Sequence, residues 1–162
     1  ASLSGAHRCL LSPLPSHPMS NAARRNSLWL DLPRSHKVRP GEVYQCDFSD
    51  LLPPEMVKIR PVIVVSRSRL TSAGSTILVV PISSTAPHVE APHHVQLAAN
   101  VSPWQAATVT SWAKCDMLYA VARSRLSLII RRGKQFKIRL DADELHTVRL
   151  AASSGFFGGQ LT

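Results

Sequence analysis

Long apolar segments and paired cysteines are both missing from this sequence of 162 residues. No apolar run approaches the roughly 18 residues that a membrane-spanning helix needs, which predicts a soluble protein without a membrane partner. The three cysteines, Cys9, Cys46 and Cys115, are odd in number and far apart in the chain. Their spacing argues against a disulfide scaffold and favours the reducing cytoplasm. The length fits one domain with one core.

Acidic side chains are also scarce. Ten Asp and Glu stand against 19 Lys and Arg, which gives a net charge of +9. The excess lies in residues 1–40 and 101–162, at +5 each, and five of the basic residues crowd into 131–139. Such a surface gains free energy by releasing counterions that are condensed on nucleic acid, so a polyanion is the expected partner. A merely solubilising surface is the alternative.

The chain divides into three parts by composition. Residues 1–37 lack periodicity and are rich in Ser, Pro, Ala and Arg, which predicts a basic, mobile N-terminal tail. Met19 within it is a candidate start of the native chain, which would make residues 1–18 an added or upstream segment. Residues 38–155 are expected to form the folded domain, and residues 156–162 a short C-terminal tail.

The pattern within the domain predicts several short strands and one closing helix. The Pro53-Pro54 pair forbids both a strand and a helix interior, so a loop is expected around it. Asp141 is a candidate helix N-cap with Glu144 three residues on, and Gly155 is the expected end of the helix. The sequence therefore predicts a mainly β, α+β domain built as a small, partly open barrel. Strands are expected at 41–48, 60–66, 75–83, 93–99 and 111–120.

Two opposite charges occupy the middle of the last of these strands. Side chains alternate between the faces of a strand, so Lys114 and Asp116 are expected on one face, with Cα atoms roughly 6.5 to 7 Å apart. They could both reach one bound group or form an ordinary structural ion pair. Cys115 would lie on the opposite face as an inert core thiol rather than a nucleophile.

Neighbouring histidines raise the question of a metal site. His93 and His94 are adjacent, with His88 and Glu90 close by. Adjacent strand residues face opposite sides of a sheet, so the pair is not expected to hold one ion, and neither a metal nor another cofactor is predicted. Trp112 could stack on a base, or serve in packing or a dimer contact.

Four stretches, in order and spacing, resemble the PemK/MazF family of toxin–antitoxin ribonucleases: RPGEVYQCDF, PPEMVKIRPVIVVS, ILVVPISS and WAKCDMLYAVARSRL. The resemblance spans about residues 39–126 and extends more loosely to about residue 154. It implies an SH3-like barrel of the MazF/CcdB type that forms a homodimer and cuts single-stranded RNA without a metal ion. It also implies a cognate antitoxin lying across the RNA groove, growth inhibition by the free toxin, and DNA binding by the toxin–antitoxin complex.

The resemblance also implies a catalytic set. Arg60 matches the family arginine that precedes a strand proline, and Ser83 matches a threonine that follows Pro-Ile. Lys114 and Asp116 match the basic-Cys-Asp triplet of the Kid/PemK branch, with lysine in place of arginine, and Met117 stands where many relatives have glutamine. Asp116 would act as base, Arg60 and Ser83 would stabilise the transition state, and Lys114 would act as acid or phosphate clamp. Five further residues are expected to contact RNA: Glu55, at a polar loop position of the family, Lys58, Ser84, Arg123 and Arg125.

Each of these assignments has a structural rival. Arg60 could pair with Glu55 or Asp50, and Ser83 could be an ordinary turn residue at the end of a strand. The same fold also serves CcdB proteins, which inhibit DNA gyrase without cleaving RNA. The alternatives to an endoribonuclease are therefore a non-catalytic RNA-binding relative and a CcdB-like gyrase inhibitor.

Overall fold

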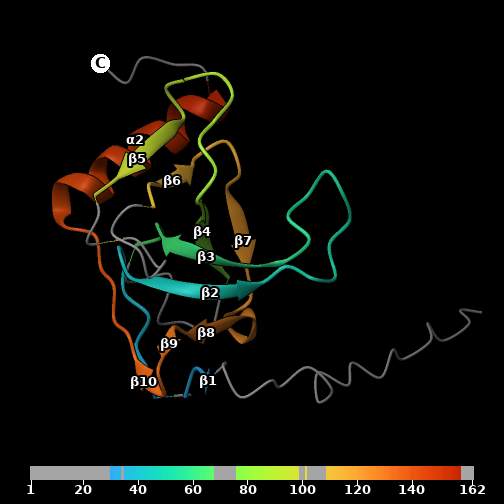
Figure 1. Cartoon of the computed structure of the whole chain (residues 1–162), viewed down its shortest axis with the longest axis vertical. Coiled ribbons are helices and arrows are strands. Elements are labelled where there is room, and N and C mark those ends of the chain that lie inside the picture. Colours follow the sequence, from blue (N-terminus) through green and yellow to red (C-terminus); the bar gives the residue numbers. More distant parts are fainter. Residues whose placement is uncertain (1–29, 34, 68–75, 99–100, 102–108, 158–162) are drawn as a thin grey trace, which may run out of the picture.

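The structure, a computed structural model, describes residues 30–33, 35–67, 76–98, 101 and 109–157. Ten short strands and a C-terminal helix form the framework of this part of the chain (Figure 1). The elements are β1 (Leu30–Asp31), β2 (Val43–Asp47), β3 (Ile59–Val64), β4 (Ile77–Ser83), β5 (His94–Leu97), β6 (Ser111–Lys114), β7 (Tyr119–Val121), the 3₁₀ turn η3 (Arg123–Arg125), β8 (Leu126–Leu128), β9 (Ile130–Arg131), β10 (Lys134–Gln135) and α2 (Ala142–Phe157).

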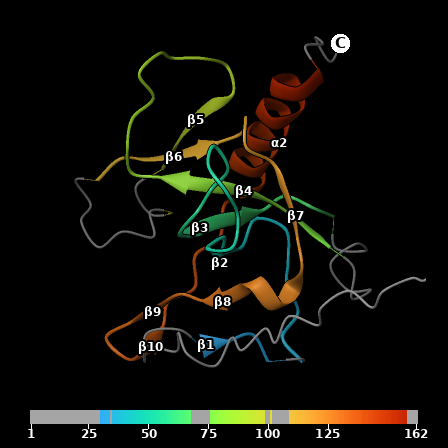
Figure 2. The same cartoon turned by 90° about the vertical axis from the view of Figure 1, so that its right-hand side faces the viewer.

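Eight of these strands form one open antiparallel sheet, and β9 and β10 pair with each other. The order of the eight-stranded sheet is β1-β8-β2-β3-β4-β6-β5, and β7 pairs with β4 beside this path. Figure 2 shows the strands from β5 to β1 stacked down the molecule, with the small β9–β10 hairpin at the lower end. The predicted mainly β, partly open architecture with a C-terminal helix is confirmed. The predicted loop around the two prolines is also confirmed, and it connects β2 to β3.

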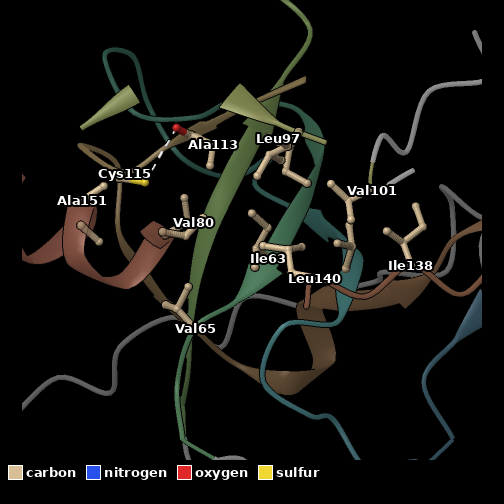
Figure 3. Close-up of a cluster of buried hydrophobic side chains, with 14 of the residues drawn as sticks. Ile63, Val65, Val80, Leu97, Val101, Ala113, Cys115, Ile138, Leu140 and Ala151 are labelled. Carbon is tan, nitrogen blue, oxygen red and sulfur yellow. Dashed lines mark hydrogen bonds between the residues drawn. The ribbon is translucent and has the colours of Figure 1, made fainter. Parts of the chain in front are cut away.

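The central strands β3 and β4 are buried on both faces. Both consist largely of β-branched residues, which pack well on a pleated surface. Because side chains alternate along a strand, each strand supplies two separate hydrophobic clusters. Ile63, Val80 and Ile82 belong to the first cluster, which α2 covers, whereas Val62, Val64 and Val79 belong to the second. Figure 3 shows part of the first cluster, with Ala151 of α2 approaching Val80 of β4.

The strand predicted over 111–120 is in fact two strands. β6 pairs with β4 through Ala113 opposite Ile82, and β7 pairs with it through Tyr119 opposite Val79. Between these two pairs, β4 has two residues, whereas the segment from Ala113 to Tyr119 has five. Three residues of that segment therefore have no partner in β4. They form a turn closed by a hydrogen bond from Met117 N to Lys114 O (3.0 Å). The expectation of one continuous strand was therefore wrong.

Helix α2 begins as the sequence predicted and ends later. Asp141 Oδ1 accepts a hydrogen bond from Glu144 N (2.8 Å), which is the geometry of an N-cap. The expected stop at Gly155 was wrong, because the helix continues to Phe157. Gly155 instead permits close packing: a Cβ atom there would lie 3.2 Å from His93 Cβ. The glycine therefore serves the contact between α2 and the start of β5.

The folded unit begins before the boundary expected at residue 37. β1 pairs with β8, with Leu30 opposite Leu128. Arg123 Nη2 donates hydrogen bonds to the carbonyl oxygens of Pro33 (2.9 Å) and His36, and Leu32 packs against the second hydrophobic cluster. These contacts are long-range, so local composition gave no sign of them. Residues 1–29 of the predicted tail, and residues 158–162, lie outside the described residues. No helix in the described part of the chain is long and apolar enough to cross a membrane.

A pair of truncated chains tests the contribution of residues 30–37. A chain that starts at residue 38 is expected to unfold at a midpoint about 5 °C lower than one that starts at residue 30, because it loses the packing of Leu32 and two hydrogen-bond acceptors of Arg123. The measurement is thermal unfolding followed by circular dichroism. Equal midpoints would show that the segment adds nothing to the core.

Each hydrophobic cluster contains one buried cysteine. Cys46 lies in the second cluster and Cys115 in the first, where its thiol faces Ala113 O (Figure 3). Burial raises the pKa of both thiols to about 12, and the carboxylate of Asp116 adds to the effect at Cys115. The prediction of an inert core thiol at Cys115 therefore agrees with its surroundings.

Thiol labelling provides a test of this packing. In a Cys9→Ser chain at pH 8, Cys46 and Cys115 are expected to react with iodoacetamide at least about a thousandfold more slowly than in the same chain unfolded in urea. The reason is that a pKa of about 12 leaves little thiolate, and the closed core denies access to it. Mass spectrometry measures the modification of each thiol. Rates within tenfold of the unfolded chain would contradict the burial.

Candidate active site

The register of β3 and β4 brings two of the predicted catalytic residues together. Val62 pairs with Pro81, and the same antiparallel register carried two residues on brings Arg60 opposite Ser83. Residues opposite each other in a ladder share a face of the sheet. Arg60 lies on the face of the second hydrophobic cluster, since its partner in β2 is the buried Cys46.

The next two strands continue this face of the sheet. Trp112 of β6 lies opposite both Ser83 and Gln96 of β5, so a row of side chains crosses the sheet from Arg60 to Gln96. Lys114 and His94 form the adjacent pair, on the same face as Trp112. The four strands that carry these residues lie side by side in Figure 2. We call Arg60, Ser83, Trp112, Gln96, Lys114 and His94 the polar row.

A pocket opens at one end of the polar row. Its volume is about 420 Å³. Trp112, Gln96 and His94 form one side of it, and the segment that leads into β5 forms the other, through Glu90, Ala91 and Pro92. Aromatic, amide, imidazole and carboxylate groups thus surround one opening, which is a combination suited to a planar polar ligand.

Three members of the polar row have buried polar atoms without a hydrogen-bond partner among the described residues: Arg60 Nε, Trp112 Nε1 and His94 Nδ1. Leaving such atoms unpaired costs about 1–3 kcal/mol each. The guanidinium and indole nitrogens can only donate, so what they lack is an acceptor. The rival assignment of Arg60, an ion pair with Glu55 or Asp50, is not formed in the described part of the chain, where the salt bridges are His94–Asp116 and Arg125–Asp50.

Asp116 lies beside the polar row but not on the strand face that was predicted. β6 ends at Lys114, and Asp116 stands exposed in the turn that follows. Its Oδ1 lies 3.9 Å from His94 Nε2, close enough for an ion pair when the imidazole is protonated. The predicted side-by-side arrangement of Lys114 and Asp116 on one strand was therefore wrong, and the neighbour of the carboxylate is an imidazole.

The geometric argument against a shared site at His93 and His94 was also wrong. It assumed that both residues belong to one strand, but β5 begins at His94 and His93 lies in the preceding turn. The two ring centroids are 4.4 Å apart. The sequence analysis considered His94 only as a metal ligand, together with His93, and rejected it on this argument.

The hydroxyl of Ser83 also has a local role. Its Oγ accepts a hydrogen bond from Thr85 N (3.1 Å) and can donate to Thr85 O (3.4 Å), which is the turn geometry that the sequence offered as its rival assignment. Because the contact from Ser83 Oγ to Thr85 O is long, the hydroxyl hydrogen of Ser83 can turn to a better acceptor. Ser84, the next residue, is exposed.

The other predicted RNA contacts fall into two groups. Glu55 and Lys58 lie exposed in the β2–β3 loop, where Glu55 Oε2 accepts from Leu52 N (3.2 Å). Arg123 and Arg125 are instead engaged within the chain. Arg125 donates to both carboxylate oxygens of Asp50, at 2.5 and 2.7 Å, and this hydrogen bonding lowers the pKa of Asp50.

The sequence matches a known family over most of its described length. Residues 39–154 match the family described as PemK-like, MazF-like toxins of type II toxin–antitoxin systems. A protein of Haemophilus influenzae described as uncharacterized is 28% identical over 134 residues, which cover 73% of this chain and 89% of that protein.

Solved structures show the same fold. MazF from Deinococcus radiodurans superposes with a TM-score of 0.56 at 22% identity, covering 74% of this chain and 96% of that one. An endoribonuclease from a mycobacterial species, solved in complex with its cognate antitoxin, superposes with a TM-score of 0.55 at 14% identity. The match covers 76% of this chain and 98% of that one. The predicted MazF-type fold is therefore confirmed. Both the family match and the fold extend across the strands that carry the polar row, and the chain belongs to the PemK/MazF-like toxins of type II toxin–antitoxin systems.

Proposed function

We propose that this toxin is a metal-independent endoribonuclease that cleaves single-stranded RNA at the polar row. The observation that carries the proposal is a pair of donors, Arg60 Nε and Trp112 Nε1, that are buried and have no acceptor among the described residues, on the face where Ser83 also lies. RNA supplies acceptors of the required kinds, namely phosphate oxygens and base edges. The solved relatives named as endoribonucleases support the same reaction class.

The chemistry requires few groups because the attacking nucleophile belongs to the RNA. The 2′-oxygen forms a bond to the adjacent phosphorus while the bond from phosphorus to the 5′-oxygen breaks, which leaves a 2′,3′-cyclic phosphate and a free 5′-hydroxyl. One proton leaves the 2′-hydroxyl and one must reach the 5′-oxygen. We assign the first transfer to the carboxylate of Asp116 and the second to Lys114, which otherwise clamps the phosphate. A protein with these groups needs no metal ion for either step.

Charge stabilisation falls to Arg60 and Ser83. The guanidinium stays protonated at every relevant pH and presents a planar fork to phosphate oxygens. Its Nε is buried, so we expect the terminal nitrogens of the guanidinium to meet the phosphate. Ser83, opposite Arg60 in the extended register, can turn its hydroxyl hydrogen from Thr85 O to the same phosphate.

The pocket provides a place for a base next to the cleaved bond. Trp112 offers an aromatic face for stacking, and Gln96 and Glu90 offer hydrogen-bonding groups for a base edge. We expect Glu55, Lys58 and Ser84 to contact the RNA on either side. Arg123 and Arg125 remain predicted RNA contacts. Their guanidinium groups would have to donate to RNA phosphates while keeping their hydrogen bonds within the chain.

We further propose a cognate antitoxin and a homodimer. Structures of relatives in complex with an antitoxin, including MazE–MazF from Deinococcus radiodurans, support the first of these partners. An acidic segment lying across the polar row would satisfy the same donors that we assign to RNA. Val89, 75% exposed beside the pocket, and Leu52, 73% exposed in the β2–β3 loop, offer apolar contacts for such a segment.

The proposal predicts cleavage in the presence of a chelator. The full chain, incubated with a long unstructured RNA and excess EDTA, is expected to give 2′,3′-cyclic phosphate ends at a limited set of sites. Arg60→Ala and Asp116→Asn are each expected to slow cleavage by about 10²–10³-fold or more, because one loses transition-state stabilisation and the other the base. Mapping of the cut ends by primer extension and mass spectrometry provides the measurement.

Lys137→Ala serves as the matched control, since Lys137 is an exposed basic residue outside the polar row. It should cleave like the parent. A fully active Arg60→Ala chain would disprove the site, and activity that disappears with EDTA would disprove metal independence. If no folded variant cleaves, binding assays with RNA and with gyrase would separate the non-catalytic relative from the CcdB-like inhibitor.

A further inference from the structure

Three elements meet at the edge of the sheet beside the polar row. The start of β5, the turn after β6 and the end of α2 come together at one end of the molecule (Figure 1). Cys115 N donates a hydrogen bond to His93 O (3.0 Å), which ties the turn to the start of β5. Gly155 of α2 lies close to both, since a Cβ atom there would lie 3.2 Å from His93 Cβ and 3.7 Å from Cys115 O. These backbone contacts fix the positions of His93, His94 and Asp116 relative to one another.

The side chains of these three residues converge. One ligand-type atom from each of His93, His94 and Asp116 lies within 4.8 Å of the other two. The ring centroids of the two histidines are 4.4 Å apart, and His94 Nε2 is 3.9 Å from Asp116 Oδ1. Two imidazoles and one carboxylate form a donor set that suits Zn²⁺ and its first-row neighbours.

The distances fit a metal site after a small adjustment. Ligand atoms at the usual bond length to zinc stand roughly 3.4 Å apart in a tetrahedral arrangement. The longest separation here must therefore shorten by about 1.4 Å. The side chain of Asp116 is 40% exposed, so its carboxylate can swing toward the imidazoles without disturbing packed neighbours. The same exposure gives an ion a path from solvent.

The charges around the cluster are mixed. Lys114 lies opposite His94 in the ladder, and its ammonium opposes a cation. Glu90 lines the same pocket as His94 and offsets that charge. His94 Nδ1 is buried and has no hydrogen-bond partner among the described residues, whereas Nε2 lies 3.9 Å from Asp116 Oδ1. Nε2 is therefore the nitrogen placed to meet an ion together with the carboxylate.

We propose that His93, His94 and Asp116 bind a divalent transition-metal ion of the Zn²⁺ class, with a fourth coordination position open to solvent. The cleavage chemistry does not require this metal ion, but the metal site and the cleavage chemistry both use the carboxylate of Asp116. A bound ion would remove the base that the proposed function requires, so metal binding would inhibit cleavage. That consequence rests on the proposed function, whereas the binding itself does not.

Direct titration tests the site without reference to cleavage. Zn²⁺ is added to the full chain in competition with a chromogenic chelator, and the parent is expected to bind with an affinity that His93→Gln and Asp116→Asn each weaken by about a hundredfold. His88→Gln is the matched control, because His88 is an exposed histidine outside the cluster, and it should bind like the parent. A parent that binds no Zn²⁺, or variants that all bind equally, would overturn the proposal.

Two further measurements keep the test valid if a variant folds poorly. Co²⁺ added to the parent in place of Zn²⁺ should give the visible absorption of a low-coordinate site without a thiolate charge-transfer band, since the ligands are nitrogen and oxygen. A spectrum of hexaaqua Co²⁺, or one with a thiolate band, would count against this ligand set. Zn²⁺ should also raise the thermal midpoint of the parent but not that of His93→Gln.

The inhibitory consequence is measured as a ratio of cleavage rates. For the parent, the rate with EDTA divided by the rate with saturating Zn²⁺ should exceed about tenfold, and for His93→Gln at the same Zn²⁺ concentration it should approach one. A parent that binds Zn²⁺ in the titration but cleaves equally well with it would overturn the shared role of Asp116. A parent that binds Zn²⁺ and never cleaves would refute the proposed function and leave the metal site intact.

Discussion

The antiparallel pairing of β3 with β4 is the constraint on which the centre of the polar row depends. Both strands are apolar on both faces through their middle, because each supplies two hydrophobic clusters. Polar side chains can therefore enter these strands only near their ends. The register that aligns the two apolar runs, carried two residues beyond the pair of Val62 with Pro81, also aligns Arg60, near the start of β3, with Ser83, at the end of β4. The strand register that packs the core therefore also determines where Arg60 and Ser83 of the polar row lie.

Local sequence signals predicted the elements that depend on local physics. The β-branched runs gave β3 and β4, and Asp141 gave the start of α2, because strand burial and helix capping are encoded within a few residues. The break after Lys114 has no such signal: neither glycine nor proline interrupts the segment. It arises because β4 pairs with both β6 and β7 in registers that differ by three residues, which is a property of the sheet rather than of the segment.

The candidate site was predictable to the same extent. Arg60 and Ser83 lie within or at the end of strands that the sequence predicted, and the family resemblance pointed to both residues, but the pairing of the two strands was not predicted. The position of Asp116 was not predicted either, because it depends on the turn and on the hydrogen bond from Cys115 N to His93 O. The proximity of His94 to Asp116 depends on the same turn. Gly155, expected as a helix stop, serves a contact between elements about 60 residues apart in sequence that no local pattern encodes.

The net charge of +9 exaggerates the cationic surface offered to RNA. Arg125 is held by a bidentate bond to Asp50, and Arg123 by two backbone carbonyls. These hydrogen bonds stabilise the chain on either side of β2: Arg123 holds the segment before it, and Arg125 holds the segment after it. Basic charge draws RNA to the protein without selecting a sequence, since phosphate contacts position and base contacts specify. Under the proposed function, selection of a cleavage site would fall to Trp112, Gln96 and Glu90 around the pocket, which contribute no positive charge.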